Sequence, residues 1–214
     1  MEKETNLERS KMNKINEFYK KSKDIEKFTK DYINYLNEVL VNIDTKIIKK
    51  LEKHLENCRK NSQTIFVIGN GGSSTTATTM SNDLGFDILK KTQTNKPFRF
   101  VSLADNNAVI TAIANDVGYE NIFINQLKIH FRKGDSLLVI SASGNSENLL
   151  NTAKWIKKNK GKLIGFLGFN GGKLKKYCDI CVQAKTNNGE YGPVEDTHLI
   201  LNHILAHWFQ NKLN

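Results

Sequence analysis

Apolar residues recur at helical spacing between residues 25 and 55, and short apolar runs separated by helical stretches follow from residue 64 onward. A spacing of three and four residues is typical of one face of an α-helix. The first segment therefore predicts one or two long helices, with a break near residues 42–45. Residues 1–30 are rich in lysine and glutamate and have weak apolar periodicity. We expect them to form a charged N-terminal extension, followed by a single domain over residues 31–214.

Five of the short apolar runs are predicted to be strands, because each is bounded by turn residues and alternates with a helical pattern. The expected strands cover residues 64–68, 98–103, 136–140, 162–167 and 180–184. The expected helices cover residues 73–84, 106–115, 120–131, 147–158, 171–176 and 194–212. Strands that alternate with helices form a parallel sheet with helices on both faces. The predicted fold class is therefore α/β, with a five-stranded parallel sheet in a three-layer α/β/α sandwich.

Composition narrows the class of partner. The 214-residue chain carries a net charge of +10, but its lysines are widely spread and interleaved with acids. No aromatic and basic platform of the kind that binds nucleic acid is present, so we expect a solvated basic surface and no nucleic-acid partner. The sequence has no run of about 18 apolar residues, so no membrane span and no membrane partner are expected. No apolar core of a signal peptide is visible near the start. A cytoplasmic location is expected.

The three cysteines are interpreted as structural or incidental thiols. Their odd number and wide spacing argue against a disulfide framework. Cys178 and Cys181 form a lone C-x-x-C without the second pair that a zinc knuckle needs.

The segment from Ser141 to Ser146 follows a predicted strand and precedes a predicted helix. A helix N-terminus offers unpaired N–H groups and a positive dipole end, and the three serines of the segment add hydroxyl donors. Gly144 allows close backbone approach, and Ser146 is expected to cap the helix. No lysine follows as in a P-loop, so no nucleotide cofactor is expected. The segment predicts a site for a small phosphorylated metabolite.

Two other loops offer weaker signals. Residues 69–74 read Gly-Asn-Gly-Gly-Ser-Ser, which fails the dinucleotide fingerprint at Ser74. From the residues alone this loop is equally well a glycine-rich turn or a site of close ligand approach. Asn115 and Asp116 precede Gly118, and without further information they indicate only a helix C-terminus and a turn.

The last predicted helix carries Glu195 and His203, which lie roughly 80° apart around the axis at about 3.6 residues per turn. They could converge on one ligand. His203 and His207 are four residues apart, but no H-E-x-x-H pattern accompanies them, and we interpret His207 and also His198 as structural. Asp83, alone at the end of an earlier helix, is by itself no more than an exposed acid.

Taken together, these segments resemble the SIS (sugar isomerase) domain family, and within it the phosphoheptose isomerases. The resemblance covers roughly residues 33–211. It is carried by GNGGS at 69–73, NDVGYENIF at 115–123, ISASGNSENLL at 140–150, GFNGGKL at 168–174 and VEDTHLILNHIL at 194–205. It implies an α/β/α sandwich, a homotetramer, and interconversion of sedoheptulose 7-phosphate and an aldose 7-phosphate.

The resemblance also assigns roles to individual residues. It implies that substrate is bound by Asn70, Gly71, Gly72, Ser73, Asn115, Asp116, Ser141, Ala142, Ser143, Gly144, Asn145 and Ser146. His203 matches a catalytic histidine that is also a zinc ligand, and Asp83 stands where the family has a catalytic, metal-binding glutamate. Glu195 replaces a glutamine and Thr79 a zinc-binding histidine. Asp83, Glu195 and His203 are therefore the expected catalytic residues and the expected ligands of a possible zinc ion.

We expect acid–base chemistry through a cis-enediol, with His203 and Asp83 as the proton-transferring groups. Two alternatives remain open at this point. In the first alternative, the protein is an isomerase of another sugar phosphate. In the second, it is a phosphosugar-binding regulatory module without chemistry.

Overall fold

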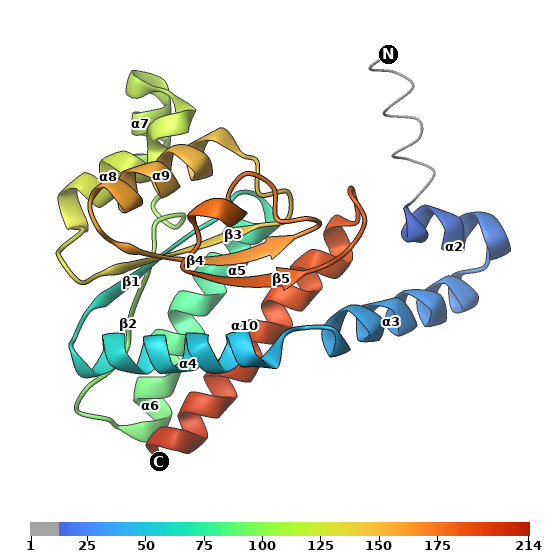
Figure 1. Ribbon diagram of the computed structural model, residues 1–214, viewed down its shortest axis with the longest axis horizontal. Helices are drawn as coiled ribbons and strands as arrows, with labels where there is room; N and C mark the ends of the chain where they lie inside the picture. The colour runs from blue at the N-terminus through green and yellow to red at the C-terminus, as the bar shows by residue number, and fades with distance from the viewer. Residues whose placement is uncertain (1–12) are drawn as a thin grey trace.

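The computed structural model describes residues 13–214, which form a central sheet covered by helices, with two further helices at the N-terminal side (Figure 1). The helices that precede the sheet are α2 (Lys14–Ser22), α3 (Ile25–Val41) and α4 (Thr45–Lys60). The strands are β1 (Thr64–Ile68), β2 (Arg99–Ser102), β3 (Ser136–Ser141), β4 (Lys162–Gly168) and β5 (Ile180–Ala184). The helices between and after them are α5 (Gly72–Ser81), α6 (Ile88–Thr92), α7 (Asn107–Val117), α8 (Ile122–His130), α9 (Glu147–Lys158) and α10 (Tyr191–Leu213).

The sheet has the strand order β2-β1-β3-β4-β5, and all neighbouring strands are parallel. In the longest pairing, β3 runs beside β4 from Ser136 opposite Lys162 to Ser141 opposite Leu167. Each strand lies within one or two residues of its predicted range, so the predicted α/β/α sandwich is confirmed. Because the strands are parallel, the loops after β1, β3 and β4 meet at one edge, where ligands bind in sheets of this kind.

The two faces of the sheet carry separate apolar cores. Val67 of β1 faces α4, α5, α6 and α10, whereas its neighbour Phe66 faces α8 and α9. This alternation follows from the two-residue period of a strand. Full burial of a leucine or isoleucine side chain stabilises the fold by about 1.5–3 kcal/mol. With helices on both faces, the strand interiors are buried throughout β1 and β3, which explains why they read as unbroken apolar runs.

Two predicted helices differ from the structure. The helix expected over residues 73–84 is α5, which ends at Ser81 and continues as a π-helical turn over Asn82–Asp87. A π-turn adds a residue to the helical turn and changes the direction in which its side chains project. The short helix expected over residues 171–176 is only a 3₁₀ turn at Lys175–Tyr177. Gly171 and Gly172 have positive φ angles that an α-helix does not accommodate.

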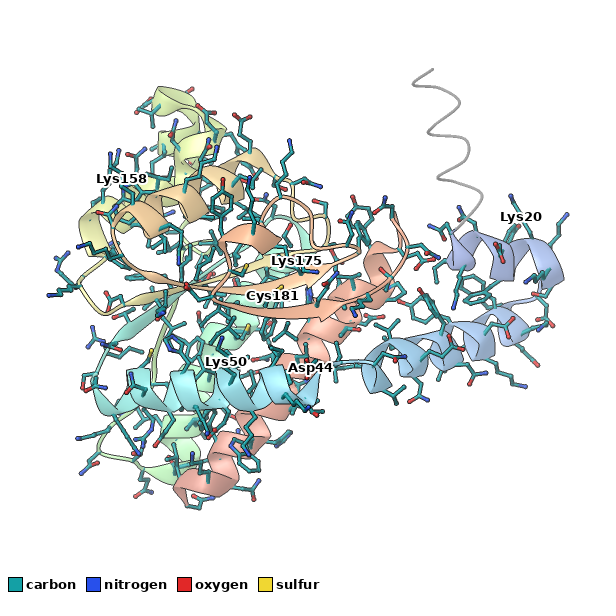
Figure 2. All side chains as sticks on the ribbon, viewed as in Figure 1. Lys20, Asp44, Lys50, Lys158, Lys175 and Cys181 are labelled. Atoms are coloured by element: carbon teal, nitrogen blue, oxygen red, sulfur yellow. The ribbon has the colours of Figure 1, made fainter. Side chains whose placement is uncertain are left out.

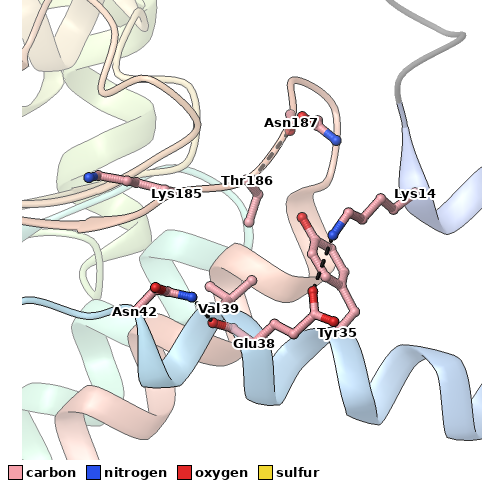
Figure 3. A pocket seen from close by; sticks show the side chains of 8 residues that line it. All are labelled: Lys14, Tyr35, Glu38, Val39, Asn42, Lys185, Thr186 and Asn187. Carbon is pink, nitrogen blue, oxygen red and sulfur yellow. Dashed lines mark hydrogen bonds and ion pairs between the residues drawn. The ribbon is translucent and has the colours of Figure 1, made fainter.

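Helix α3 is attached to the rest of the chain through two tyrosines, and α2 through the backbone N–H of Lys14, which donates to Glu190 at 2.7 Å. Tyr35 of α3 donates a 2.5 Å hydrogen bond to the buried Glu190, and Tyr32 donates one of 2.5 Å to Asp196. Burial, followed by these carboxylates, raises the pKa of both tyrosines. Figure 3 shows the polar groove of about 430 Å³ beside this contact, where Lys14 of α2 pairs with Glu38 of α3 at 3.2 Å.

The expected boundary at residues 30 and 31 falls inside α3, which is one continuous helix. The boundary between extension and domain therefore stays a prediction. Residues 1–12 of the expected extension lie outside the described part of the chain.

The lysines are spread over the surface and do not gather on one element. The labelled lysines Lys20, Lys50, Lys158 and Lys175 lie on four different elements (Figure 2). Within residues 13–214, no helix has the length and apolarity needed to cross a bilayer. The three cysteines are free thiols.

Candidate active site

A pocket of about 160 Å³ lies at the carboxyl edge of the sheet, between the loops that follow β1 and β3 and the start of α10. It is lined by Asn70, Ser73, Ile140, Ser141, Ala142, Ser143, Ser146, Leu149, Tyr191 and Glu195. Residues predicted from three distant segments of the sequence therefore meet in one cavity.

The segment Ser141–Ser146 forms a compact loop, called the serine loop below. Its own hydroxyls accept backbone N–H groups: Ser141 Oγ from Gly144 at 3.0 Å and Ser143 Oγ from Asn145 at 3.3 Å. Gly144 has a φ of +64°, and a Cβ there would collide with the carbonyl oxygen of Gly171. The loop is thus pressed against the glycine turn after β4, which explains why both segments contain glycine.

Ser146 occupies the N-cap position of α9, as predicted, but its hydroxyl makes no capping hydrogen bond. Its backbone is extended, with φ −62° and ψ 131°, and its side chain lines the pocket instead. The predicted N-cap position of Ser146 is therefore correct, but its hydroxyl does not cap the helix. A hydroxyl and the first turn of a helix therefore face the cavity together, which is the arrangement that binds anions.

Asn70, from the loop after β1, is fixed by a pair of amide hydrogen bonds. It donates to Asn148 Oδ1 at 3.0 Å and accepts from Asn148 Nδ2 at 2.9 Å, while Tyr119 donates to the same Asn70 oxygen at 3.1 Å. The amide pair connects the glycine-rich loop to the first turn of α9, so the two ligand-facing loops hold one another in register.

Glu195 projects from the first part of α10 onto the N-terminus of α5. A Cβ on Gly72 would lie 2.5 Å from Glu195 Oε2, so this glycine makes room for the carboxylate. Burial, and then the neighbouring charge of Asp196, raises the pKa of Glu195. A raised pKa makes this carboxyl a better proton acceptor near neutral pH.

Asp83 and His203 meet elsewhere. His203 Nε2 lies 3.7 Å from Asp83 Oδ2, with the histidine half exposed, and neither residue lines the serine-loop pocket. Ser73 lines the pocket, and Asp83 follows it ten positions further along α5 and the π-helical turn, which is roughly 15 Å at about 1.5 Å per residue. The single chain therefore brings together Asp83 with His203, and Glu195 with the serine loop, as two separate clusters.

The expected zinc ligands do not converge in one chain. Among residues 13–214 there is no group of three or more His, Cys, Asp or Glu side chains placed to hold a metal ion. Thr79, at the position of the family's histidine ligand, donates its hydroxyl to the Thr75 carbonyl at 3.0 Å. Asp83 and His203 alone are half of a tetrahedral zinc site. The donor set of the single chain does not fit zinc, and we derive no step through a metal.

Asn115 and Asp116 lie on α7, which extends to Val117, and not in the turn after it. Both are exposed, and Asn115 Nδ2 donates to Asp116 Oδ1 at 2.9 Å. The single chain does not bring them to the pocket. Their role in substrate binding stays a prediction.

Besides the apolar Ile140 and Leu149, which line the pocket, three residues of the site were missed by sequence reasoning. Asn148 and Tyr119 fix Asn70, and Tyr191 lines the pocket. Asn148 carried no local signal, because its partner Asn70 lies 78 residues away in sequence. Tyr191 carried none, because its place depends on how α10 crosses the sheet edge.

Comparison with known proteins identifies the family. The family model for the SIS domain matches residues 27–168. A phosphoheptose isomerase of Nitratiruptor sp. is 35% identical over 147 residues, covering 69% of this chain and 76% of that protein. One from Aliarcobacter butzleri is 30% identical over 188 residues, covering 84% and 97%.

Solved structures show the same fold. The phosphoheptose isomerase of Neisseria gonorrhoeae superposes with a TM-score of 0.75 at 22% identity, over 88% of this chain and all (100%) of that one. The Francisella tularensis protein superposes with a TM-score of 0.72 at 24% identity, over 86% and 96%. The chain therefore belongs to the SIS domain family, in which it groups with the phosphoheptose isomerases.

Proposed function

We propose that this protein is an aldose–ketose isomerase of a sugar phosphate, and that its substrate is sedoheptulose 7-phosphate, converted to a heptose 7-phosphate. One observation carries the proposal: a single pocket joins the serine loop and the N-terminus of α9 to the carboxyl group of Glu195. An anion site beside an acid–base group is what an isomerase of a phosphorylated sugar needs.

In this proposal the phosphate binds at the serine loop. Its oxygens would accept hydrogen bonds from N–H groups in the first turn of α9 and from the hydroxyl of Ser146, which makes no capping hydrogen bond. Binding at this end fixes the distance from the phosphate to the reacting carbons, which favours reaction through orientation.

The chemistry is a proton transfer between C1 and C2. A base removes the proton from C2 of the aldose while an acid protonates the C1 carbonyl oxygen, giving the cis-enediol. Return of a proton to C1 and loss of the proton on the C2 oxygen give the ketose. Asp83, His203 and Glu195 are the groups to which we assign these transfers, and help of this kind accelerates reactions by about 10²–10⁴-fold.

Because Asp83 and His203 lie away from the serine loop of their own chain, we propose that the active form is a homotetramer in which a neighbouring copy supplies them. Exposed apolar side chains flank this pair: Ile204 and Trp208 beside His203, and Phe86 three residues after Asp83, are each at least 50% exposed. An apolar groove of about 330 Å³ between α4 and α10 continues the same surface. Apolar surface of this kind favours burial between subunits. A cytoplasmic location stays a prediction of the sequence.

The test is wash-in of solvent deuterium. The protein is incubated in D₂O with sedoheptulose 7-phosphate, and in parallel with hexose and pentose ketose phosphates. Label at C1 or C2 of the heptose phosphate, with aldose formed, supports the proposal. Label only in a shorter sugar would reassign the substrate. Binding of sugar phosphate without label in any of them would identify a regulatory module, and the proposal would be wrong.

A further inference from the structure

Asn202 is a fully buried amide on α10, immediately before His203. Its Nδ2 donates a hydrogen bond of 2.6 Å to Asp83 Oδ2, across 119 residues of sequence. The same oxygen lies 3.7 Å from His203 Nε2. One carboxylate oxygen of Asp83 is therefore shared between a buried donor and an exposed imidazole.

The other oxygen of Asp83 is held as well. Asn82 Nδ2 donates to Asp83 Oδ1 at 3.0 Å. Asn82 is exposed and adjacent in sequence, so this bond is local, whereas the bond from Asn202 crosses from α10 to the π-helical turn. The hydrogen bond from Asn202 therefore fixes the orientation of Asp83 relative to α10, the helix that carries His203.

Asn202 is poorly explained as a stabilising residue. Its Oδ1 is buried and has no hydrogen-bond partner among residues 13–214, and the same is true of both ring nitrogens of His198, one turn earlier on α10. Burial lowers the pKa of His198 to about 4. A buried acceptor without a partner costs about 1–3 kcal/mol. An apolar residue of the same size would avoid that cost, so the amide at position 202 is better explained by the hydrogen bond that it donates to Asp83.

We propose that Asn202 is a positioning residue, which holds Asp83 Oδ2 toward His203 so that the two act as one proton-transferring pair. The inference rests on the proposed isomerase function and extends it to a residue outside the expected site. Asn202 itself is buried beneath the pair and touches no substrate.

The test compares Asn202→Leu with a matched control on the same two elements. Gln210, two turns further along α10, donates to Asp87 Oδ2 at 3.0 Å and is also buried. Gln210→Leu therefore removes the same type of hydrogen bond, between α10 and the end of the same π-helical turn, away from Asp83. Asn202→Ala and Gln210→Ala form a second pair, in case leucine is not accommodated at either position.

We expect both Asn202 variants to lower kcat about ten- to hundredfold, because misplacement of a catalytic group by about 1 Å costs this much, with KM for the sugar phosphate changed less than about twofold. Both Gln210 variants should keep kcat and KM within about twofold of the wild type. Thermal unfolding measures folding for all four, and Asn202→Leu should unfold at or above the wild-type temperature.

Two outcomes would overturn the inference in different ways. If the wild type turns over the sugar phosphate and the Asn202 variants match it, or if their loss equals that of the Gln210 variants, Asn202 is only structural and the isomerase function stands. If the wild type shows no turnover with any sugar phosphate of the panel, the proposed function itself is wrong, and the inference falls with it.

Discussion

The carboxylate of Glu195 rests against the α-carbon of Gly72, where a Cβ would come within 2.5 Å of Oε2. This contact joins the start of α10 to the first residue of α5 and places an acid at the wall of the serine-loop pocket. Gly72 has no positive φ angle, so its backbone conformation does not require glycine. The space that the Glu195 carboxylate occupies does.

Gly72→Ala is therefore expected to displace Glu195 without unfolding the protein. The methyl group meets the flexible end of a side chain, and alanine is the better helix former by about 1 kcal/mol, so the unfolding temperature should hold or rise. We expect kcat/KM for the sugar phosphate to fall at least about tenfold. Steady-state kinetics and thermal unfolding check this.

A double variant provides the control. In a Glu195→Ala background the added methyl has nothing to displace, so Gly72→Ala should cause no further loss of kcat/KM. An additional loss of the same size would mean that Gly72 acts on the substrate directly and not through Glu195.

Ser146→Ala separates ligand binding from helix capping. Because the Ser146 hydroxyl makes no capping bond, its removal should change the free energy of unfolding by less than about 0.5 kcal/mol, while KM for the sugar phosphate rises. Asp44, whose carboxylate accepts from the backbone of Lys46 and Ile47 at the start of α4, is the matched control. Asp44→Ala should cost about 1 kcal/mol and leave KM unchanged. Denaturant titrations in which both variants lose equal stability would contradict this view of Ser146.

Much of this architecture could be predicted from the sequence because it depends on local pattern. The ranges of β1, β5 and α9 coincide with those predicted, and the break between α3 and α4 falls at residues 42–44. The serine loop was identifiable because strand, hydroxyls and helix start are consecutive in sequence. Its hydroxyl-rich composition predicts an anion site before any tertiary structure is known.

The rest depends on contacts between distant segments. The amide pair of Asn70 and Asn148 spans 78 residues, and the bond from Asn202 to Asp83 spans 119. Neither follows from periodicity, because each is set by how helices cross the sheet. The expected convergence of Asp83, Glu195 and His203 does not occur within one chain for the same reason. Glu195 and His203 are correctly placed on one helix, but they lie roughly 12 Å apart along its axis at about 1.5 Å per residue.

The stability of the protein should depend on pH through Glu195. Burial and Asp196 raise its pKa above the ordinary value of 4.5, so the folded chain holds this proton more tightly than the unfolded chain. That stabilisation is complete below the unfolded pKa and is lost as pH rises through the folded pKa. Glu195→Gln removes the charge and keeps the shape. We expect the variant and the wild type to unfold at equal temperatures near about pH 4, and the variant to unfold at the higher temperature at about pH 7.

Thermal unfolding across this range checks the sign. A variant that is less stable than the wild type at neutral pH would mean that the ionised carboxylate is favoured by the N-terminus of α5, and that its pKa is lowered and not raised.

Removal of metal distinguishes a site with donors from one chain from a metal site shared between chains. The described residues of one chain offer no set of three metal-binding side chains. If the site draws its donors from one chain only, dialysis against EDTA should therefore change kcat by less than about twofold, whereas loss of a catalytic zinc abolishes turnover. Metal content by mass spectrometry accompanies the kinetics. One zinc ion per chain, with activity lost on dialysis and restored by zinc alone, would show that donors from more than one chain form the site.

Two inactive variants should restore activity to each other if neighbouring copies share a site. Asp83→Asn removes the proton-transferring carboxylate, and Ser143→Ala/Ser146→Ala removes hydroxyls of the serine loop, so each alone should be slow. After unfolding and refolding as an equal mixture, random assembly into homotetramers gives about a quarter of the sites an intact serine loop from one copy and an intact Asp83 from another. We expect turnover to recover toward that fraction, with each variant refolded alone as the control. A site formed within one chain contains at least one defect in every subunit of the mixture. It would therefore show no recovery, whatever the oligomeric state measured by light scattering.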